Sequence, residues 1–411
     1  MNILVVSHAL AFGGAQISTL EFLERLKHVV RLKILTCKNS SREFVKRINS
    51  LGIHIYQVTG HTTTVYPQIE LNDVSKLIEW ADIVWITDEI YHVAPRIKGL
   101  KKVPVVAHLH SHALICPWWV ASYGFKEVCL KRCSPWRIIR CKQNVNLELA
   151  KIGLLSNVKA ATYWFLDFAK GPIDYFKWSI LMRGVIESID AFIPASETTW
   201  RIHTNHIPEL NYKPFRVIRN FVTEPLKYIK PNPDEPPESY VLYVSGANVL
   251  KGPHLLLKAW SRIFKEFRDL ELYMVGCRST WVEKLAKKLE VRNVMFLDRF
   301  SPSKQYYYLM YKAKVVILPS LVPEAFGRVP VEANRLGVPA VVTDIGSLPE
   351  IVKDEVTGII ARTDSDSLAE AITKAISREW NRSEIIKNVT ERFNPQDATS
   401  RLLNFFEDLR K

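Results

Sequence analysis

The chain has 411 residues, of which 47% are hydrophobic and 24% are charged. This composition excludes a disordered chain and a bundle of membrane helices, and the length favours two domains of roughly 200 residues each. The formal net charge is +14, and the segment 98–183 holds 14 basic but only four acidic residues. Such a segment favours an anionic partner, which could be nucleic acid, an anionic lipid surface or a phosphate-bearing substrate. A basic face that only aids solubility is an equally good interpretation.

Strand-like and helix-like segments alternate in the first half of the chain. Short apolar runs predict strands, and the spacing of Ile17, Leu20 and Leu23 is typical of a helix with one apolar face. Because no basic region precedes the first apolar run, we expect no signal peptide and a cytoplasmic location. The alternation indicates a mostly parallel sheet with helices on both faces. The predicted strands are 2–7, 31–36, 53–58, 82–87, 103–108 and 190–195, and the predicted helices are 15–26, 41–51 and 69–80.

A proline-rich stretch at 221–238 interrupts this alternation, and it predicts a connector because proline suits neither a helix interior nor a central strand. The alternation then restarts, so we predict an α/β fold of two doubly wound domains, 1–220 and 239–394, followed by a final helical segment, 395–411. Ligands of such sheets bind beyond the carboxyl ends of the strands, which places the expected site in a cleft between the halves. The predicted strands of the second half are 240–245, 271–275, 293–297, 314–318 and 338–343, and its predicted helices are 251–267, 281–289, 303–311, 330–335, 348–353, 366–376 and 396–409.

The strongest local pattern is PEAFGRVPVEA, residues 323–333, which follows one of these strands and opens a helix. Glu324 and Glu332 lie eight residues apart in it, and carboxylates suit vicinal hydroxyls because each oxygen can accept a hydrogen bond. Gly327 permits close approach of the backbone, and a helix N-terminus offers N–H groups to a phosphate. Two surface glutamates beside a tight turn would explain the pattern equally well.

Three further strand-to-helix turns carry ligand-binding residue types. Lys251 could neutralise a diphosphate, although a lysine at a helix start is usually a solvated residue. Gly346 and the amide of Ser347 suit contact with an anion. Gly13 and Gly14 in the first domain would let the backbone approach a ligand, and alone they are weak evidence.

Taken together and in this order, these motifs resemble the retaining nucleotide-sugar glycosyltransferases of family four, which have the GT-B fold. The resemblance runs over nearly the whole chain. It implies two Rossmann-like domains that face each other across a cleft, with the acceptor bound by the N-terminal domain and the nucleotide sugar by the C-terminal one. It also implies that the final helix packs back on the N-terminal domain.

The resemblance also implies roles for particular residues. Glu332 would bind the donor ribose, Glu324 the hydroxyls of the donor sugar, and Lys251 the diphosphate. His110 occupies the place of the family's histidine near the reacting centre. The implied catalytic residues are His110, Lys251 and Glu324, and the implied donor-binding residues are Gly13, Gly14, Lys251, Glu324, Ala325, Phe326, Gly327, Arg328 and Glu332.

The sequence departs from the family pattern at three places. Gly246 stands where the family commonly has an arginine, so Arg219 or Arg328 are candidates for its charge. Ser111 replaces an acidic residue that often follows the histidine, and Asn220-Phe221 replaces an asparagine-glycine turn. The acceptor site is not defined by any motif; its candidate residues are His108, His112 and Arg219.

The expected mechanism follows from the absence of a carboxylate pair in the first domain that could form a covalent intermediate. The resemblance therefore implies front-face transfer, in which the leaving diphosphate helps to deprotonate the acceptor hydroxyl. No Asp-x-Asp signature occurs, so no catalytic metal is expected. The expected donor is a UDP- or GDP-linked sugar.

Four of the six cysteines fall in one loop-rich segment, at Cys116, Cys129, Cys133 and Cys141. Four thiolates could hold a structural zinc ion, and the spacing of the middle pair is common among zinc ligands. Disulfides and free thiols remain open alternatives.

Aromatic residues alternate with lysines between Tyr163 and Arg183. This mixture suits the surface of an anionic membrane, where the protein would act peripherally on the inner face on a glycan or polyprenyl-linked acceptor. An amphipathic helix that faces the core explains the stretch equally well. Three other functions remain open: a sugar-phosphate synthase with a soluble acceptor, an inactive sugar-nucleotide binder, and a nucleic-acid-binding protein. No recognition helix, zinc finger or aromatic strand motif supports the last, so no nucleic-acid partner is expected.

Overall fold

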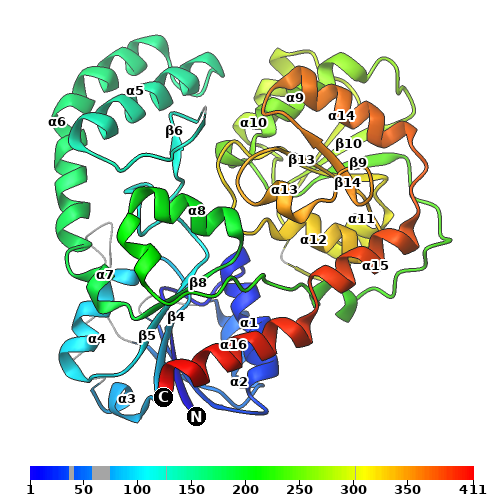
Figure 1. The fold of residues 1–411 in the computed structure, drawn as a ribbon. Coiled ribbons are helices and arrows are strands. Elements are labelled where there is room, and N and C mark those ends of the chain that lie inside the picture. The colour runs from blue at the N-terminus through cyan, green and yellow to red at the C-terminus, as the bar shows by residue number, and fades with distance from the viewer. Residues whose placement is uncertain (37–40, 58–74, 126, 301) are drawn as a thin grey trace.

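The structure, a computed structural model, describes residues 1–36, 41–57, 75–125, 127–300 and 302–411 (Figure 1). Two six-stranded parallel sheets occupy the two halves of the chain. In both sheets the third, second and first strands are followed in space by the fourth, fifth and sixth, which is the order of doubly wound nucleotide-binding folds. The prediction of an α/β fold with two Rossmann-like domains is confirmed.

The strands of the first sheet are apolar runs that are buried on both faces. Along β1, Leu4 and Val6 pack into one core cluster, whereas Ile3 and Val5 pack into a second one on the opposite face. In spatial order the strands are β3 (His54–Gln57), β2 (Arg31–Thr36), β1 (Asn2–Ser7), β4 (Ile83–Ile86), β5 (Val105–Leu109) and β8 (Ala191–Pro194). The helices of this half, apart from α5 and α6, are α1 (Gly14–Leu26), α2 (Arg42–Asn49), α3 (Ser75–Trp80), α4 (Ala94–Leu100), α7 (Val185–Ser188) and α8 (Glu197–His206).

The second sheet repeats this arrangement. Val241 and Tyr243 of its first strand face one core cluster, and Tyr240 and Leu242 face another. Its strands in spatial order are β11 (Val294–Leu297), β10 (Glu271–Val275), β9 (Tyr240–Tyr243), β12 (Val315–Leu318), β13 (Ala340–Thr343) and β14 (Gly358–Ala361). The helices are α9 (Pro253–Ile263), α10 (Trp281–Lys288), α11 (Lys304–Lys312), α12 (Arg328–Arg335), α13 (Leu348–Ile351), α14 (Ser365–Ser377) and α15 (Arg382–Arg392).

The predicted strands form within two residues of their expected ends, except that residue 58 lies outside the described part of the chain. The predicted helices also form, although residues 69–74 of one lie outside the described part and the helix predicted at 251–267 ends at Ile263. Strand β14 was not predicted, because it is only four residues long and begins on a glycine. The sequence patterns also did not predict helices α4, α7, α8 and α15.

Helices α5 (Pro135–Lys151) and α6 (Asn157–Leu181) lie against each other as a hairpin that projects from the first domain (Figure 1). Ser134 and Ser156 begin the two helices, each by accepting a backbone hydrogen bond three residues ahead. The helices pack tightly at Gly171, where a Cβ would lie 2.9 Å from Cγ1 of Ile139. Among the helices of the described residues, none is long and apolar enough to cross a membrane.

The last helix, α16 (Pro395–Arg410), runs from the second half of the chain back to the first (Figure 1). Its apolar face enters the core cluster that also contains Ile3 and Val5 of β1. The ring of Phe406 packs edge-on against Trp85, with a centroid separation of 5.6 Å. Burial of this face therefore ties the end of the chain to the first sheet.

Truncation of this contact should destabilise the first domain. Phe406→Ala leaves a cavity beside Trp85, and we expect a loss of about 3–5 kcal/mol in the free energy of unfolding, measured by urea denaturation. Tyr212, which is 91% exposed, supplies the control, because Tyr212→Ala should change this value by no more than about 0.5 kcal/mol. Equal urea midpoints for Phe406→Ala and the wild type would contradict the packing of α16 described above.

Candidate active site

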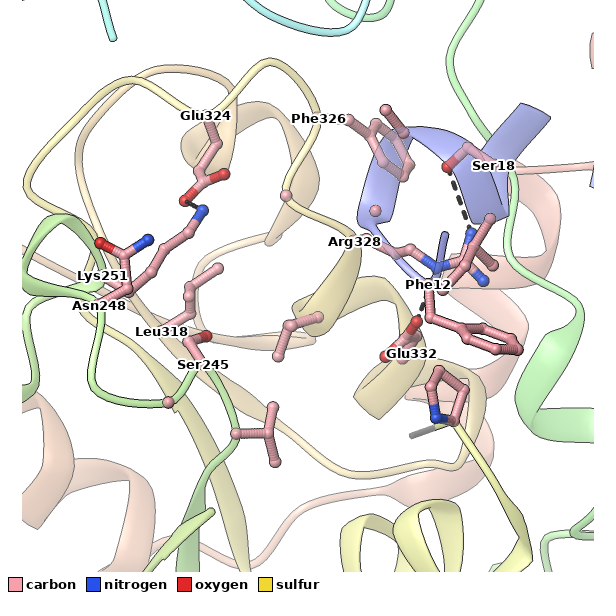
Figure 2. Close-up of a pocket in the computed structure, with 18 of the residues that line it drawn as sticks. Phe12, Ser18, Ser245, Asn248, Lys251, Leu318, Glu324, Phe326, Arg328 and Glu332 are labelled. Carbon is pink, nitrogen blue, oxygen red and sulfur yellow. Dashed lines mark hydrogen bonds and ion pairs between the residues drawn. The ribbon is translucent and has the colours of Figure 1, made fainter. Parts of the chain in front are cut away.

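A cavity of about 370 Å³ lies between the two domains, at the carboxyl ends of both sheets (Figure 2). The prediction that the two domains face each other across a cleft is therefore confirmed. The first domain contributes Phe12, Gly14, Ala15, Ile17, Ser18, His110 and Asn220 to its lining. Lining residues of the second domain include Ser245, Gly246, Asn248, Lys251, Arg299, Phe300, Tyr306, Glu324, Ala325, Phe326, Gly327, Arg328 and Glu332.

Glu324 stands in the loop after β12, where a β-bridge joins it to Gly346. Gly346 has a φ of +62°, and a Cβ there would lie 2.4 Å from the backbone nitrogen of Glu324, so the close approach requires glycine. Oε1 of Glu324 accepts hydrogen bonds from Nζ of Lys251 at 2.6 Å and from Oγ of Ser320 at 2.5 Å. Burial alone would raise the pKa of Glu324, but Lys251 and Ser320 hold that pKa below its ordinary value. Glu324 is therefore an ionised carboxylate on the cavity wall.

Glu332 stands at the other end of the cavity, on α12 (Figure 2). Gly327 precedes the helix with a φ of +78°, and Arg328 is its first residue. Because Arg328 and Glu332 are four residues apart, they share one face of the helix. Nε of Arg328 donates to Oε1 of Glu332 at 2.7 Å, and Nη1 donates to Oε2 of Glu21, on α1 of the first domain, at 2.6 Å. The guanidinium thus joins two buried carboxylates from different domains.

The ionisation of Glu332 depends on this arrangement. Burial raises its pKa to about 7, although the guanidinium of Arg328 favours the charged form. Because one guanidinium serves two carboxylates, the negative charge of Glu21 further disfavours ionisation of Glu332. Glu332 therefore titrates close to neutral pH.

His110 follows β5 and reaches the cavity from the first domain. Its Nδ1 lies 2.7 Å from the carbonyl oxygen of Thr87, and its Nε2 lies 3.2 Å from Oδ1 of Asn220. The ring stacks on His108 with a centroid separation of 3.8 Å. Burial lowers the pKa of His110, so its imidazole is neutral at neutral pH.

The three candidate residues for the acceptor do not line this cavity. His108 and His112 are buried, at 0% and 1% exposure. The guanidinium of Arg219 lies 3.7 Å from the carboxylate of Glu350. Gly13, predicted for the donor, lies beside the lining residue Gly14 without itself belonging to the lining.

The prediction of a structural zinc site is not supported. Within the described ranges, no group of three or more histidine, cysteine, aspartate or glutamate residues is arranged to hold a metal ion. Cys116, Cys129, Cys133 and Cys141 are free thiols. The thiols interact with separate groups instead: Cys141 donates to the oxygen of Ser122 at 3.6 Å, and Cys129 to that of Lys131 at 3.6 Å.

Several residues of the cavity were not predicted from the sequence, and Arg299 is the most informative of them. Arg299 follows β11, so its place at the carboxyl end of a predicted strand was the signal that could have identified it. Within the described part of the chain, its guanidinium makes no hydrogen bond or ion pair, in contrast to Lys251 and Arg328. Arg328, a candidate for the missing family arginine, is already neutralised by Glu21 and Glu332.

Two facing Rossmann-like domains with a shared cavity define a GT-B fold. Residues 227–392 match the family model described as glycosyl transferases group 1. The matched segment contains Lys251, Glu324 and Glu332. The second domain is therefore similar to those of group 1 glycosyl transferases.

Curated relatives are also similar to only part of this chain. An uncharacterised glycosyltransferase of Methanocaldococcus jannaschii is 30% identical over 178 residues, which are 41% of this chain and 45% of the relative. A D-inositol 3-phosphate glycosyltransferase of Corynebacterium urealyticum is 26% identical over 180 residues, 41% of this chain and 42% of the relative. The chain thus spans less than half the length of these relatives.

Solved structures are similar over both domains. Anabaena HepE in complex with UDP-glucose has a TM-score of 0.69 at 16% identity, with coverage of 99% of this chain and 100% of HepE. Sucrose-phosphate synthase of Thermosynechococcus elongatus has a TM-score of 0.66 at 17% identity, with coverage of 100% and 99%. At these identities the similarity establishes the fold.

The raised pKa of Glu332 predicts a pH-dependent stability. Between the ordinary value and about 7, the folded protein keeps a proton that the unfolded chain releases, so stability falls as the pH rises through this range. Relative to Glu332→Gln, the wild type should lose on the order of 2–3 kcal/mol of unfolding free energy between about pH 5 and about pH 8. Urea denaturation at a series of pH values measures this difference, and a difference that does not vary with pH would contradict the assignment.

Proposed function

We propose that this protein is a retaining glycosyltransferase that moves a sugar from a nucleoside diphosphate sugar to a glycan or lipid-linked acceptor. The observation that carries the proposal is the interdomain cavity, with Glu324 beside Lys251 at one end and Glu332 at the other (Figure 2). The match of residues 227–392 to group 1 glycosyl transferases supports it. Anabaena HepE, which is similar in fold, binds UDP and UDP-glucose, so we propose a UDP-linked donor.

The two ends of the cavity suit the two ends of such a donor. Glu332 accepts hydrogen bonds from the ribose hydroxyls, beside the aromatic side chains of Phe300 and Tyr306, which suit a nucleobase. Glu324 accepts hydrogen bonds from hydroxyls of the transferred sugar. The donor-binding set that we propose therefore follows the resemblance, with Arg299 added to it.

The diphosphate requires positive charge between these ends. Lys251 is paired with Glu324, and Arg328 is paired with two carboxylates, so neither brings net charge to the cavity. Arg299 is the described cation of the lining without a carboxylate partner. We propose that Arg299 supplies the charge that an arginine at position 246 would otherwise provide, together with the N–H groups at the start of α12.

The same geometry favours front-face transfer. The first-domain residues that line the cavity include no carboxylate, so none of them is placed to form a covalent sugar intermediate. In the proposed step the bond from the sugar to the diphosphate breaks, the acceptor oxygen bonds to the same carbon, and the acceptor proton passes to the leaving diphosphate. Arg299 and the N–H groups at the start of α12 stabilise the charge that develops on that group. Neutral His110 acts from the opposite domain as a hydrogen-bonding group for the sugar.

A panel of UDP-, GDP- and ADP-sugars in thermal unfolding tests the donor site. One nucleotide family should raise the melting temperature by on the order of 5 °C at saturating concentration, because ligand binds only the folded state. Glu332→Ala should abolish this shift, whereas Glu379→Ala, an exposed glutamate on the second domain, should retain it. A shift that survives in Glu332→Ala would refute the role of Glu332. Stabilisation without release of nucleoside diphosphate on addition of membrane extract or sugar phosphates would favour an inactive sugar-nucleotide binder.

We also propose that the protein acts at an anionic membrane surface, because the α5–α6 hairpin exposes apolar side chains together with lysines. Ile173, Phe176 and Ile180 form a stripe along α6 with exposures of 52%, 56% and 68%. Lys170 and Lys177 on the same helix are also exposed and could meet anionic headgroups. The exposed large apolar side chains of the hairpin are Trp136, Leu147, Val158, Tyr163, Phe165, Leu166, Phe168, Ile173, Phe176 and Ile180.

This surface predicts binding to vesicles that contain anionic lipid. Sedimentation should show binding that weakens with added salt, and the triple change of Ile173, Phe176 and Ile180 to serine should reduce it at least tenfold, because apolar insertion is lost. The same change of three exposed apolar residues elsewhere, Val29, Tyr212 and Tyr308, is the control and should leave binding unchanged. No binding to anionic vesicles would favour a soluble acceptor, as in the structurally similar sucrose-phosphate synthase.

A further inference from the structure

A buried chain of charged groups runs from the cavity into the interdomain connector. Glu21 on α1 stands at its centre and is only 1% exposed. Sequence analysis assigned no role to this residue, and it does not line the cavity. Its two carboxylate oxygens have separate partners.

One oxygen of Glu21 holds the connector. Oε1 accepts hydrogen bonds from the backbone nitrogen of Thr223 at 2.6 Å, from the hydroxyl of Thr223 at 3.0 Å and from the backbone nitrogen of Glu224 at 2.8 Å. Glu224, itself buried, is paired with Arg47 of α2 and Lys227. The start of the connector is therefore fixed to the first domain through Glu21.

The other oxygen holds the second domain. Oε2 of Glu21 accepts a hydrogen bond from Nη1 of Arg328, whose Nε donates to Glu332. Nη1 also donates to Oγ of Ser18, one turn before Glu21, at 3.3 Å (Figure 2). Nη2 of the same guanidinium is buried and has no hydrogen-bond partner among the described residues. The counter-ion of Glu332 is thus also held from the opposite domain.

The charged and polar groups around Glu332 determine how readily its carboxyl group ionises. Glu21 on α1 and Glu224 on the connector disfavour its negative charge, while Arg328 favours it. From α11, the hydroxyl of Tyr306 lies 3.5 Å from Oε2 of Glu332. Hydroxyls that donate to Glu332 would stabilise its charged form and strengthen its pairing with Arg328. Because both domains line the cavity, a ligand at Glu332 favours the docked arrangement of the domains, and the contact of Arg328 with Glu21 stabilises that same arrangement. By linkage, docking of the domains and binding at Glu332 should then favour each other.

We infer that Glu21 is a positioning residue for donor binding: it holds Arg328 against Glu332 across the domain interface and so couples occupancy of the ribose site to the docking of the two domains. This inference rests on the proposed donor site. Glu21 touches neither the nucleotide nor the reacting atoms. It acts through Arg328 on one side and through the connector backbone on the other.

Glu24 provides a matched control on the same helix. It also reaches the connector, through Lys227 at 2.7 Å, and it is paired with Arg47 at 3.0 Å. Its carboxylate makes no hydrogen bond or ion pair with Arg328 in the described part of the chain. If Glu21 only holds the connector, Glu21 and Glu24 act in the same way. If Glu21 also acts on Glu332 through Arg328, only its substitution affects Glu332.

The test is titration of UDP, or of GDP if the wild type prefers it, by calorimetry at several pH values. In the wild type, binding should weaken as the pH falls below about 7, where Glu332 takes up a proton. Glu21→Gln should bind about tenfold more weakly at about pH 8. Its pH midpoint should move down by about one unit, because Arg328 then serves Glu332 alone. Glu24→Gln should match the wild type in both respects.

The outcomes separate this inference from the donor proposal. If the wild type binds neither nucleotide, both fail. If the wild type binds and Glu332→Ala does not, but Glu21→Gln behaves like Glu24→Gln, only the inference on Glu21 fails. Weaker binding with an unchanged pH midpoint would show a structural role and would also overturn it. Should Glu21→Gln not fold, Arg328→Lys takes its place, because one ammonium cannot span both carboxylates as the guanidinium does, and it should weaken binding similarly.

Discussion

One buried guanidinium joins the two domains at the edge of the cavity. Arg328 belongs to the second domain, and its charge is balanced partly by Glu21 of the first. Separation of the domains would break the contact of Arg328 with Glu21, while Arg328 would keep Glu332 as its partner on the same helix. Helix α16, which packs on the first sheet, supports the same arrangement from the other side of the molecule.

The cavity combines acids and bases in a way that suits a ligand with both hydroxyl groups and negative charge. Each carboxylate of its lining is paired with a cation, so both acids can accept hydrogen bonds without filling the cavity with negative charge. Arg299 then gives the lining its uncompensated positive charge. A neutral sugar would form no ion pair with Arg299. A phosphate without a sugar would bring no sugar hydroxyls to the two carboxylates. A nucleoside diphosphate sugar carries both the negative charge and the hydroxyl groups that such a lining can bind.

The α5–α6 hairpin differs from the rest of the first domain in that many of its apolar side chains are exposed. The strands bury their apolar residues on two faces, whereas α6 has few partners besides α5 and leaves Phe176 and Ile180 exposed. The aromatic-basic stretch in the sequence allowed either a core helix or a membrane-facing one. Trp178 does pack against the core, and its Nε1 donates to the oxygen of Ala113, so the helix is anchored by one edge only.

The sequence by itself determined the two alternating α/β domains. The period and length of apolar runs are local properties, and they can be recognised without knowledge of the tertiary structure. It also indicated that Glu324 and Lys251 would stand at strand-to-helix turns, with Glu332 in the helix that follows one of them, and turns at the carboxyl edge of parallel strands meet. The short strand β14 and helix α5 gave no such local signal, whereas the stretch that forms α6 allowed an amphipathic helix. Only the tertiary structure decided which groups pair: Arg328 with Glu21, 307 residues apart in sequence, and the four cysteines with separate partners instead of a shared metal. Pairing of this kind depends on distances between elements that no local pattern encodes. For that reason the sequence could predict residues that line the cavity, such as Glu324 and Glu332, but not their ionisation.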